Sequence, residues 1–77
     1  DVDGFDASLM PATGTPEPGG LFWDETLNII KIAAKYSDIV GADINELAPI
    51  KKFDSYNFLA AKLAYKIIAY SFEFKKN

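Results

Sequence analysis

The chain has 77 residues, eight of them basic and 11 acidic, which gives a formal net charge of −3. Because it has no dense cluster of Lys and Arg, we expect no nucleic acid as a partner. It contains no cysteine, which excludes disulfide bridges and thiolate-bound metals as sources of stability.

Hydrophobic residues make up 49% of the chain, including six Phe, four Tyr and one Trp. A chain this short buries only about 60% of the surface that it exposes when unfolded. We therefore expect part of the apolar surface to pack against structure outside this chain. Apolar runs such as Ile67–Tyr70 are too short to span a membrane, and the first residues do not resemble a signal peptide. We expect no membrane contact and a cytoplasmic location, and we expect that the chain begins inside a longer reading frame or has been processed.

The first motif is a group of acids, Asp1, Asp3 and Asp6, around Gly4. On a strand, Asp1 and Asp3 would point the same way and form half of a site for a hard divalent cation. An ordinary acidic turn, in which Asp6 bonds to nearby backbone amides, is the alternative interpretation. A calcium loop is excluded, because its Gly belongs at the sixth position and its bidentate Glu where Ala12 stands.

Two elements are predicted next. Residues 7–21 are rich in Pro, Gly, Thr and Ala, a composition typical of a shaped loop. Apolar residues at helical spacing then predict a helix over residues 23–36. Phe22 occupies the N-cap position of this helix and is a poor cap.

The second half of the sequence predicts a strand followed by a helix. Residues 38–44 are typical of a short buried strand with Gly41 at a close approach, and residues 54–73 of a long helix. Lys75 and Lys76 are expected at a solvated terminus. The apolar face of the helix is interpreted as core packing rather than a partner groove; it comprises Phe58, Leu59, Leu63, Ile67 and Tyr70.

The order strand, helix, strand, helix is the pattern of an α/β protein with a parallel sheet covered by helices. Ligands of such sheets gather at the carboxyl ends of the strands. Asp1 and Asp3 stand at one such end and Glu46 just past the other. We therefore expect three carboxylates to converge at one edge of the sheet.

Two blocks carry a resemblance to a known family. D-V-D-G-F-D at residues 1–6, with P-A-T-G-T-P-E-P-G-G-L at residues 11–21, resembles the C-terminal signature of the ureohydrolases, the arginase/agmatinase family. Residues 40–49 resemble a later strand of that family, and residues 58–66 are more similar to agmatinase-type sequences than to arginase. The resemblance implies that residues 1–77 are the C-terminal portion of one domain with a three-layer α/β/α fold, and that the loop at 7–21 lies near its active site.

The resemblance also implies a binuclear manganese enzyme that hydrolyses a guanidino compound to urea and an amine. Asp1 and Asp3 match the metal-binding aspartates, Glu46 the glutamate that grips the guanidinium, and Thr15 a loop residue lining the pocket. Agmatine, giving putrescine, is the favoured substrate. The chain has no histidine, so at most half of the ligand set is present. No catalytic residue is assigned, and the 77-residue chain alone is expected to be inactive.

Two departures from the family pattern are visible, Ala7 where Pro is usual and Phe22 where Ser or Thr caps the helix. Arginine, guanidinobutyrate, guanidinopropionate and formimidoylglutamate stay open as substrates. A non-catalytic structural or interaction fragment is the alternative function, although the presence of Asp1, Asp3 and Glu46 together favours the enzyme. As in the family, the full-length protein is expected to form a homo-oligomer, a trimer or a hexamer.

Overall fold

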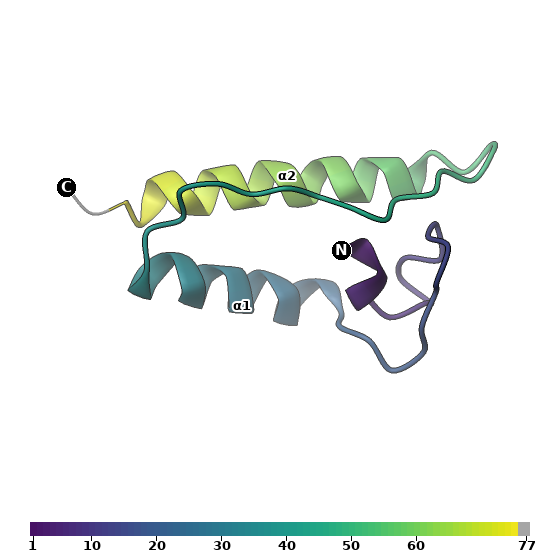
Figure 1. Cartoon of the computed structure of the whole chain (residues 1–77), viewed down its shortest axis with the longest axis horizontal. Helices are drawn as coiled ribbons and strands as arrows, with labels where there is room; N and C mark the ends of the chain where they lie inside the picture. Colours follow the sequence, from purple (N-terminus) through teal and green to yellow (C-terminus); the bar gives the residue numbers. More distant parts are fainter. Residues whose placement is uncertain (76–77) are drawn as a thin grey trace.

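The computed structural model describes residues 1–75 as one short 3₁₀ helix and two α-helices (Figure 1). The 3₁₀ helix η1 spans Val2–Gly4, α1 spans Trp23–Tyr36 and α2 spans Ser55–Glu73. Figure 1 shows α1 and α2 running in the same direction, joined by an extended segment that returns along α2. The helices predicted over residues 23–36 and 54–73 are therefore confirmed.

Helix α1 begins at the predicted N-cap, Phe22, whose backbone is extended. Its aromatic side chain offers no acceptor to the helix, but the Glu25 carboxylate accepts a hydrogen bond from the Phe22 N–H at 2.7 Å. The Thr26 hydroxyl donates to the Phe22 carbonyl at 2.7 Å. Neither bond replaces the acceptor that a Ser or Thr cap would offer to the first N–H groups of the helix, but the Glu25 bond supplies the other half of a capping box.

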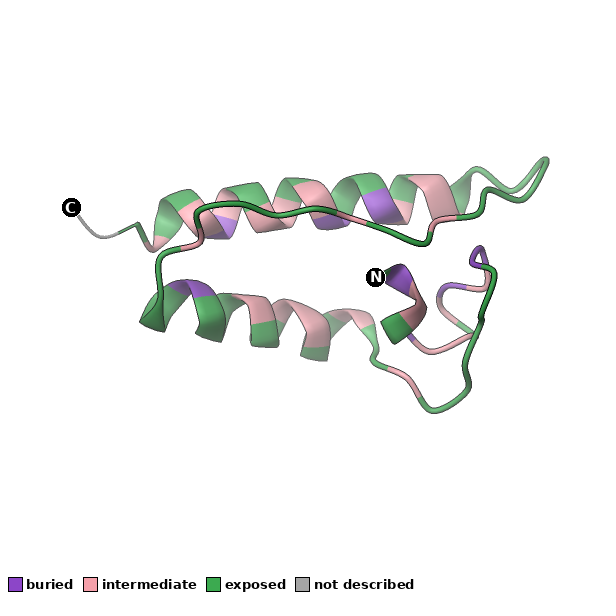
Figure 2. Ribbon diagram, in the orientation of Figure 1, coloured by how far each residue is buried: buried purple, intermediate pink, exposed green. Residues whose placement is uncertain are grey.

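Helix α2 is apolar on two opposite sides. Leu63 and Tyr70 are buried, whereas Phe58, Tyr65 and Phe72, which recur every seven residues, are each 68–70% exposed. The prediction that Phe58 belongs to the core-packing face is therefore wrong. Phe58 lies five residues from Leu63, about 140° around the helix, and so points away from the core. Figure 2 shows the buried positions of α2 on the side that faces the rest of the chain.

The core is small and lies where η1 and the loop after it meet the two helices (Figure 2). The Phe5 ring stacks on Trp23, with centroids 6.2 Å apart, and so ties the end of η1 to the start of α1. Aromatic pairs of this kind add about 0.5–1.5 kcal/mol to the burial of their area. The buried cluster comprises Val2, Phe5, Met10, Ala12 and Leu63.

The two expected strands are not formed. The start of the chain is the 3₁₀ helix η1, and residues 38–44 are extended without a ladder. Val40 is 97% exposed, and nothing lies within 4 Å of the position that a Cβ on Gly41 would occupy. A strand needs neighbours to accept and donate its backbone hydrogen bonds, and residues 1–75 contain only two isolated bridges.

One backbone contact joins η1 to the residue that directly follows the segment expected to be a strand. The Val2 N–H donates to the Asn45 carbonyl at 3.0 Å. Ile44 and Leu47 pack against the buried cluster beside this contact. The connection between the helices therefore lies next to η1, where a sheet of parallel strands would place it.

Within residues 1–75, no helix has both the length and the apolar character needed to cross a membrane. Of the two lysines expected at a solvated terminus, Lys75 is exposed and Lys76 lies outside the described residues.

The chain is more open than a compact domain of its size. Its accessible surface is 5381 Å², whereas a folded monomer of 8.5 kDa exposes about 4,700 Å². Its radius of gyration is 13.1 Å, against about 11.5 Å for a compact chain of this length. Much of the excess surface is apolar, as on the outer side of α2.

We expect the isolated 77-residue chain to unfold without a cooperative thermal transition, because its core is small and its helices expose large apolar side chains. Circular dichroism at far- and near-ultraviolet wavelengths would follow the loss of helix and of aromatic packing. Gradual loss of the helical signal with no near-ultraviolet signal is the expected result. Coincident sigmoidal transitions at both wavelengths would contradict it.

Candidate metal- and substrate-binding site

The loop over residues 7–21 is closed by the carboxylate of Asp6. Its Oδ1 accepts hydrogen bonds from the N–H groups of Gly19 at 2.8 Å and Gly20 at 3.3 Å. Its Oδ2 accepts from the Ser8 N–H at 2.9 Å and from the Ser8 hydroxyl. One side chain thus joins the first residues of the loop to the last.

These hydrogen bonds favour the ionised form of Asp6. The Ser8 hydroxyl, followed by the N–H groups of Ser8, Gly19 and Gly20, holds the pKa of Asp6 below its usual value of 3.8. The Asp6 side chain is therefore an anion at neutral pH, and an ionised carboxylate has enough lone pairs to accept all four hydrogen bonds.

Backbone contacts close the same loop tightly. The Asp6 N–H donates to the Leu21 carbonyl at 2.8 Å, and the Ala7 N–H donates to the Glu17 carbonyl at 2.9 Å. A Cβ placed on Gly20 would lie 2.6 Å from the Asp6 nitrogen and the Phe5 carbonyl carbon. Only glycine fits at residue 20, because the neighbouring atoms belong to the backbone.

The closed loop brings together two of the predicted site residues. The Thr15 hydroxyl donates to Oδ2 of Asp3 at 3.0 Å, across 12 positions of sequence. The Thr15 N–H in turn donates to the buried Thr13 hydroxyl at 3.0 Å. Thr15 is therefore fixed on one side by the loop, while its side chain binds a predicted metal ligand.

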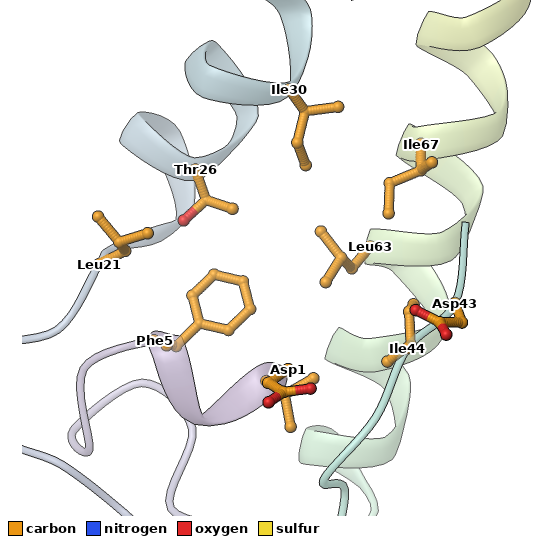
Figure 3. A pocket seen from close by; sticks show the side chains of 11 residues that line it. Asp1, Phe5, Leu21, Thr26, Ile30, Asp43, Ile44, Leu63 and Ile67 are labelled. Carbon is orange, nitrogen blue, oxygen red and sulfur yellow. The ribbon is translucent and has the colours of Figure 1, made fainter. Parts of the chain in front are cut away.

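Asp1 lies on another side of η1. It lines an open hollow of about 200 Å³ between η1, α1 and α2, whose walls include Phe5, Ile30 and Leu63 (Figure 3). Asp3 does not line this hollow. A 3₁₀ helix turns about 120° per residue, so side chains two positions apart diverge, whereas on a strand they point the same way. The structure therefore does not place Asp1 and Asp3 on one face, as the strand prediction required.

Glu46 is exposed and lies on the segment that passes beside η1 and the loop. Its neighbour Asn45 accepts the bond from Val2, and the Ala48 N–H donates to the Ala12 carbonyl at 2.7 Å. The φ angle of Glu46 is 72°, in the left-handed region that a residue with a Cβ occupies at a cost of about 1–2 kcal/mol. Strained residues of this kind cluster at functional sites.

The three carboxylates expected at one edge do not form a metal cluster. Within residues 1–75, no three Asp, Glu, His or Cys side chains lie close enough to hold an ion. The expected convergence depended on two paired strands, which are not formed. As a donor set, Asp1 and Asp3 still suit Mn²⁺, which accepts carboxylate oxygens. Their chemistry would supply part of a manganese site, but in this structure the two side chains diverge, and further ligands would have to come from other residues.

Sequence reasoning treated Asp6 only as a residue that stabilises a turn. The structure makes it the residue that holds the whole loop closed. The feature of the sequence that could have predicted this role is the Gly19-Gly20 pair, because successive glycine N–H groups often bind one nearby anionic acceptor.

A profile of the arginase family matches residues 1–70. The chain belongs to the arginase family. Membership implies an α/β fold, although residues 1–75 form helices without strands. No solved structure gives a significant match.

The chain is 47% identical over 70 residues to the N(1)-aminopropylagmatine ureohydrolase of Synechocystis sp., covering 91% of this chain and 23% of that protein. It is 41% identical over 71 residues to the agmatinase of Pyrococcus horikoshii, covering 92% and 25%. It is 35% identical over 69 residues to the guanidinobutyrase of Pseudomonas aeruginosa, covering 88% and 21%. The chain thus spans about a quarter of the length of these relatives, which are hydrolases of guanidino compounds.

We expect Gly20→Ala in the full-length protein to lower the free energy of unfolding by about 1–3 kcal/mol, the usual range for overpacking. The added methyl group would overlap the backbone of Phe5 and Asp6. Denaturant unfolding would measure the loss. The matched control is Gly14→Ala, because nothing lies within 4 Å of a Cβ at residue 14. Equal losses for the two variants would contradict the close approach.

We expect the hydrogen bonds of Asp6 to make the stability of the full-length protein depend on pH. Its pKa is lowered by folding, so its contribution is complete above the unfolded value of 3.8 and is lost as the pH falls through the lower, folded value. Asp6→Asn should be less stable than the wild type at neutral pH, and the two should converge in acid. Urea midpoints across a pH series would show it. A constant difference in midpoint down to the acid limit would contradict the assignment.

Proposed function

We propose that this chain is the C-terminal part of a binuclear manganese enzyme that hydrolyses a guanidino compound to urea and an amine. Membership of the arginase family and the names of the relatives support this reaction class. The observation in the structure that carries the proposal is the Thr15–Asp3 hydrogen bond. It joins a candidate pocket residue to a candidate metal ligand.

Each candidate residue has a role that its chemistry allows. Asp1 and Asp3 would hold manganese with their carboxylates, completed by ligands from outside this chain. The metal pair, when bound, supplies a water of lowered pKa as the nucleophile. Glu46 would accept two N–H groups of the planar guanidinium and orient its carbon, and Thr15 would border the same pocket.

The substrate we propose is agmatine or an agmatine that carries a further aminoalkyl group. Three similar proteins are named as agmatinase or N(1)-aminopropylagmatine ureohydrolase. Both names describe guanidino compounds with a cationic amine at the far end. Guanidinobutyrate, which carries a carboxylate there, is the alternative that the similarity to a guanidinobutyrase suggests. Arginine and formimidoylglutamate remain further alternatives.

We also propose how the site is completed. In the full-length protein, residues 1–3 and 38–44 would pair as strands of the central sheet of a three-layer α/β/α domain. Asp1 and Asp3 would then share one face, and Glu46 would follow the neighbouring strand. The Val2–Asn45 hydrogen bond supports this arrangement, because it joins Val2 to the residue that directly follows residues 38–44. A cytoplasmic trimer or hexamer belongs to the same proposal and rests on the family resemblance alone.

The test is urea release by the full-length protein loaded with Mn²⁺, with agmatine, aminopropylagmatine and guanidinobutyrate compared by kcat/KM. We expect Glu46→Gln to lower kcat/KM by about 10–100-fold, since a hydrogen bond to a charged group contributes about 1.5–3 kcal/mol. Asp38→Asn, an exposed acid on the same connecting segment, is the matched control and should leave the rate unchanged. The isolated 77-residue chain should release no urea.

Failure of the full-length protein to release urea from any guanidino compound would overturn the enzyme proposal. The alternative would then be a non-catalytic fragment that contributes only to structure or interaction.

A further inference from the structure

We propose that Asp6 is a positioning residue for the metal site, acting through Thr15 on the carboxylate of Asp3. The inference rests on the proposed manganese-binding role of Asp3. Asp6 itself would touch neither metal nor substrate. It would hold the loop closed, so that the Thr15 hydroxyl meets one oxygen of Asp3 and leaves the other for the metal.

The first step is the closure of the loop. The four hydrogen bonds to the Asp6 carboxylate come from Ser8 on one side and from Gly19 and Gly20 on the other. They span residues 8 to 20, and Thr15 lies between these ends. Because donors from both ends meet on one side chain, loss of that carboxylate would release both ends together.

The second step is the position of Thr15 within the closed loop. Its N–H donates to the Thr13 hydroxyl, and Thr13 is buried. The Thr13 N–H donates to the Pro11 carbonyl at 2.9 Å. The backbone of Thr15 is therefore fixed relative to the core end of the loop, but its distance from η1 depends on the closure that Asp6 provides.

The third step is the orientation of Asp3. The Thr15 hydroxyl binds Oδ2 of Asp3 at 3.0 Å, and no other hydrogen bond to this carboxylate forms within residues 1–75. Asp3 is half-buried and lies in the middle of η1, so this hydrogen bond is the contact that sets the rotamer of its side chain. A carboxylate held through one oxygen presents the other in a fixed direction, which is how hydrogen-bond partners of metal ligands strengthen metal binding.

The experiment is a double-mutant cycle in the full-length protein, with Mn²⁺ binding as the readout. The variants are Asp6→Asn, Thr15→Val, the two combined, and Thr15→Ser. Titration followed by the electron paramagnetic resonance signal of free Mn²⁺ gives the stoichiometry and the dissociation constant separately. Stoichiometry reports the folded fraction, and the dissociation constant reports the site, so a purely structural defect and a positioning defect give different results.

We expect Asp6→Asn and Thr15→Val each to weaken Mn²⁺ binding about 10-fold, within the range known for partners of metal ligands. The double variant should be no weaker than the worse single variant, because both act through one hydrogen bond. Thr15→Ser, which keeps the hydroxyl, should bind as the wild type does. Glu17→Gln removes an exposed charge from the same loop and is the control that should change nothing.

Three results would overturn the proposal. One is additive losses, about 100-fold in the double variant, which would make the two residues independent. Another is an unchanged dissociation constant with a reduced stoichiometry in Asp6→Asn, which would limit Asp6 to folding. The third is weak binding by Thr15→Ser. If instead the wild-type protein bound no Mn²⁺, the proposed function itself would fail.

Discussion

The hydrogen bonds of the Asp6 carboxylate organise the first third of this chain. They convert a segment rich in Pro and Gly, which has no regular structure of its own, into a closed loop of fixed shape. The closed loop buries Met10 and Ala12, which form the core together with Phe5. The candidate contact between Thr15 and Asp3 lies on the same loop. Local folding and the candidate site therefore depend on one anionic side chain.

A second constraint is that a β-strand needs neighbouring strands to complete its backbone hydrogen bonds. Residues 38–44 have the composition of a buried strand, yet within the described part of the chain they are unpaired, and all but Ile39 and Ile44 are exposed. A helix satisfies its hydrogen bonds within itself, so α1 and α2 form without outside help. A strand depends on structure that lies elsewhere. The Thr15–Asp3 contact forms because the loop is closed by its own residues. The cluster of three carboxylates is absent because it would require two paired strands.

These constraints decide how much could be predicted from the sequence. Both helices were predictable, because their spacing of apolar residues is a local property. The two strands predicted from composition are not present within residues 1–75. The outward direction of Phe58 could not be predicted, since α2 is apolar on opposite sides and spacing alone does not tell which side faces the core. The resemblance to a family marked Asp3 and Thr15 as candidate site residues, but only the structure showed the hydrogen bond between them.

The parallel course of the helices has an electrostatic consequence. Because the connection between them crosses back along α2, both helices begin at the end of the molecule that holds η1 and the loop (Figure 1). Each helix start carries the positive end of the peptide dipoles, equivalent to about half a unit charge. Acidic side chains gather toward that end, namely Asp1, Asp3, Asp6 and Glu17 on η1 and the loop, Asp24 and Glu25 in the first turn of α1, and Glu46 on the segment beside η1. Two aligned helix dipoles therefore offset part of the repulsion among carboxylates in a chain whose net charge is already negative.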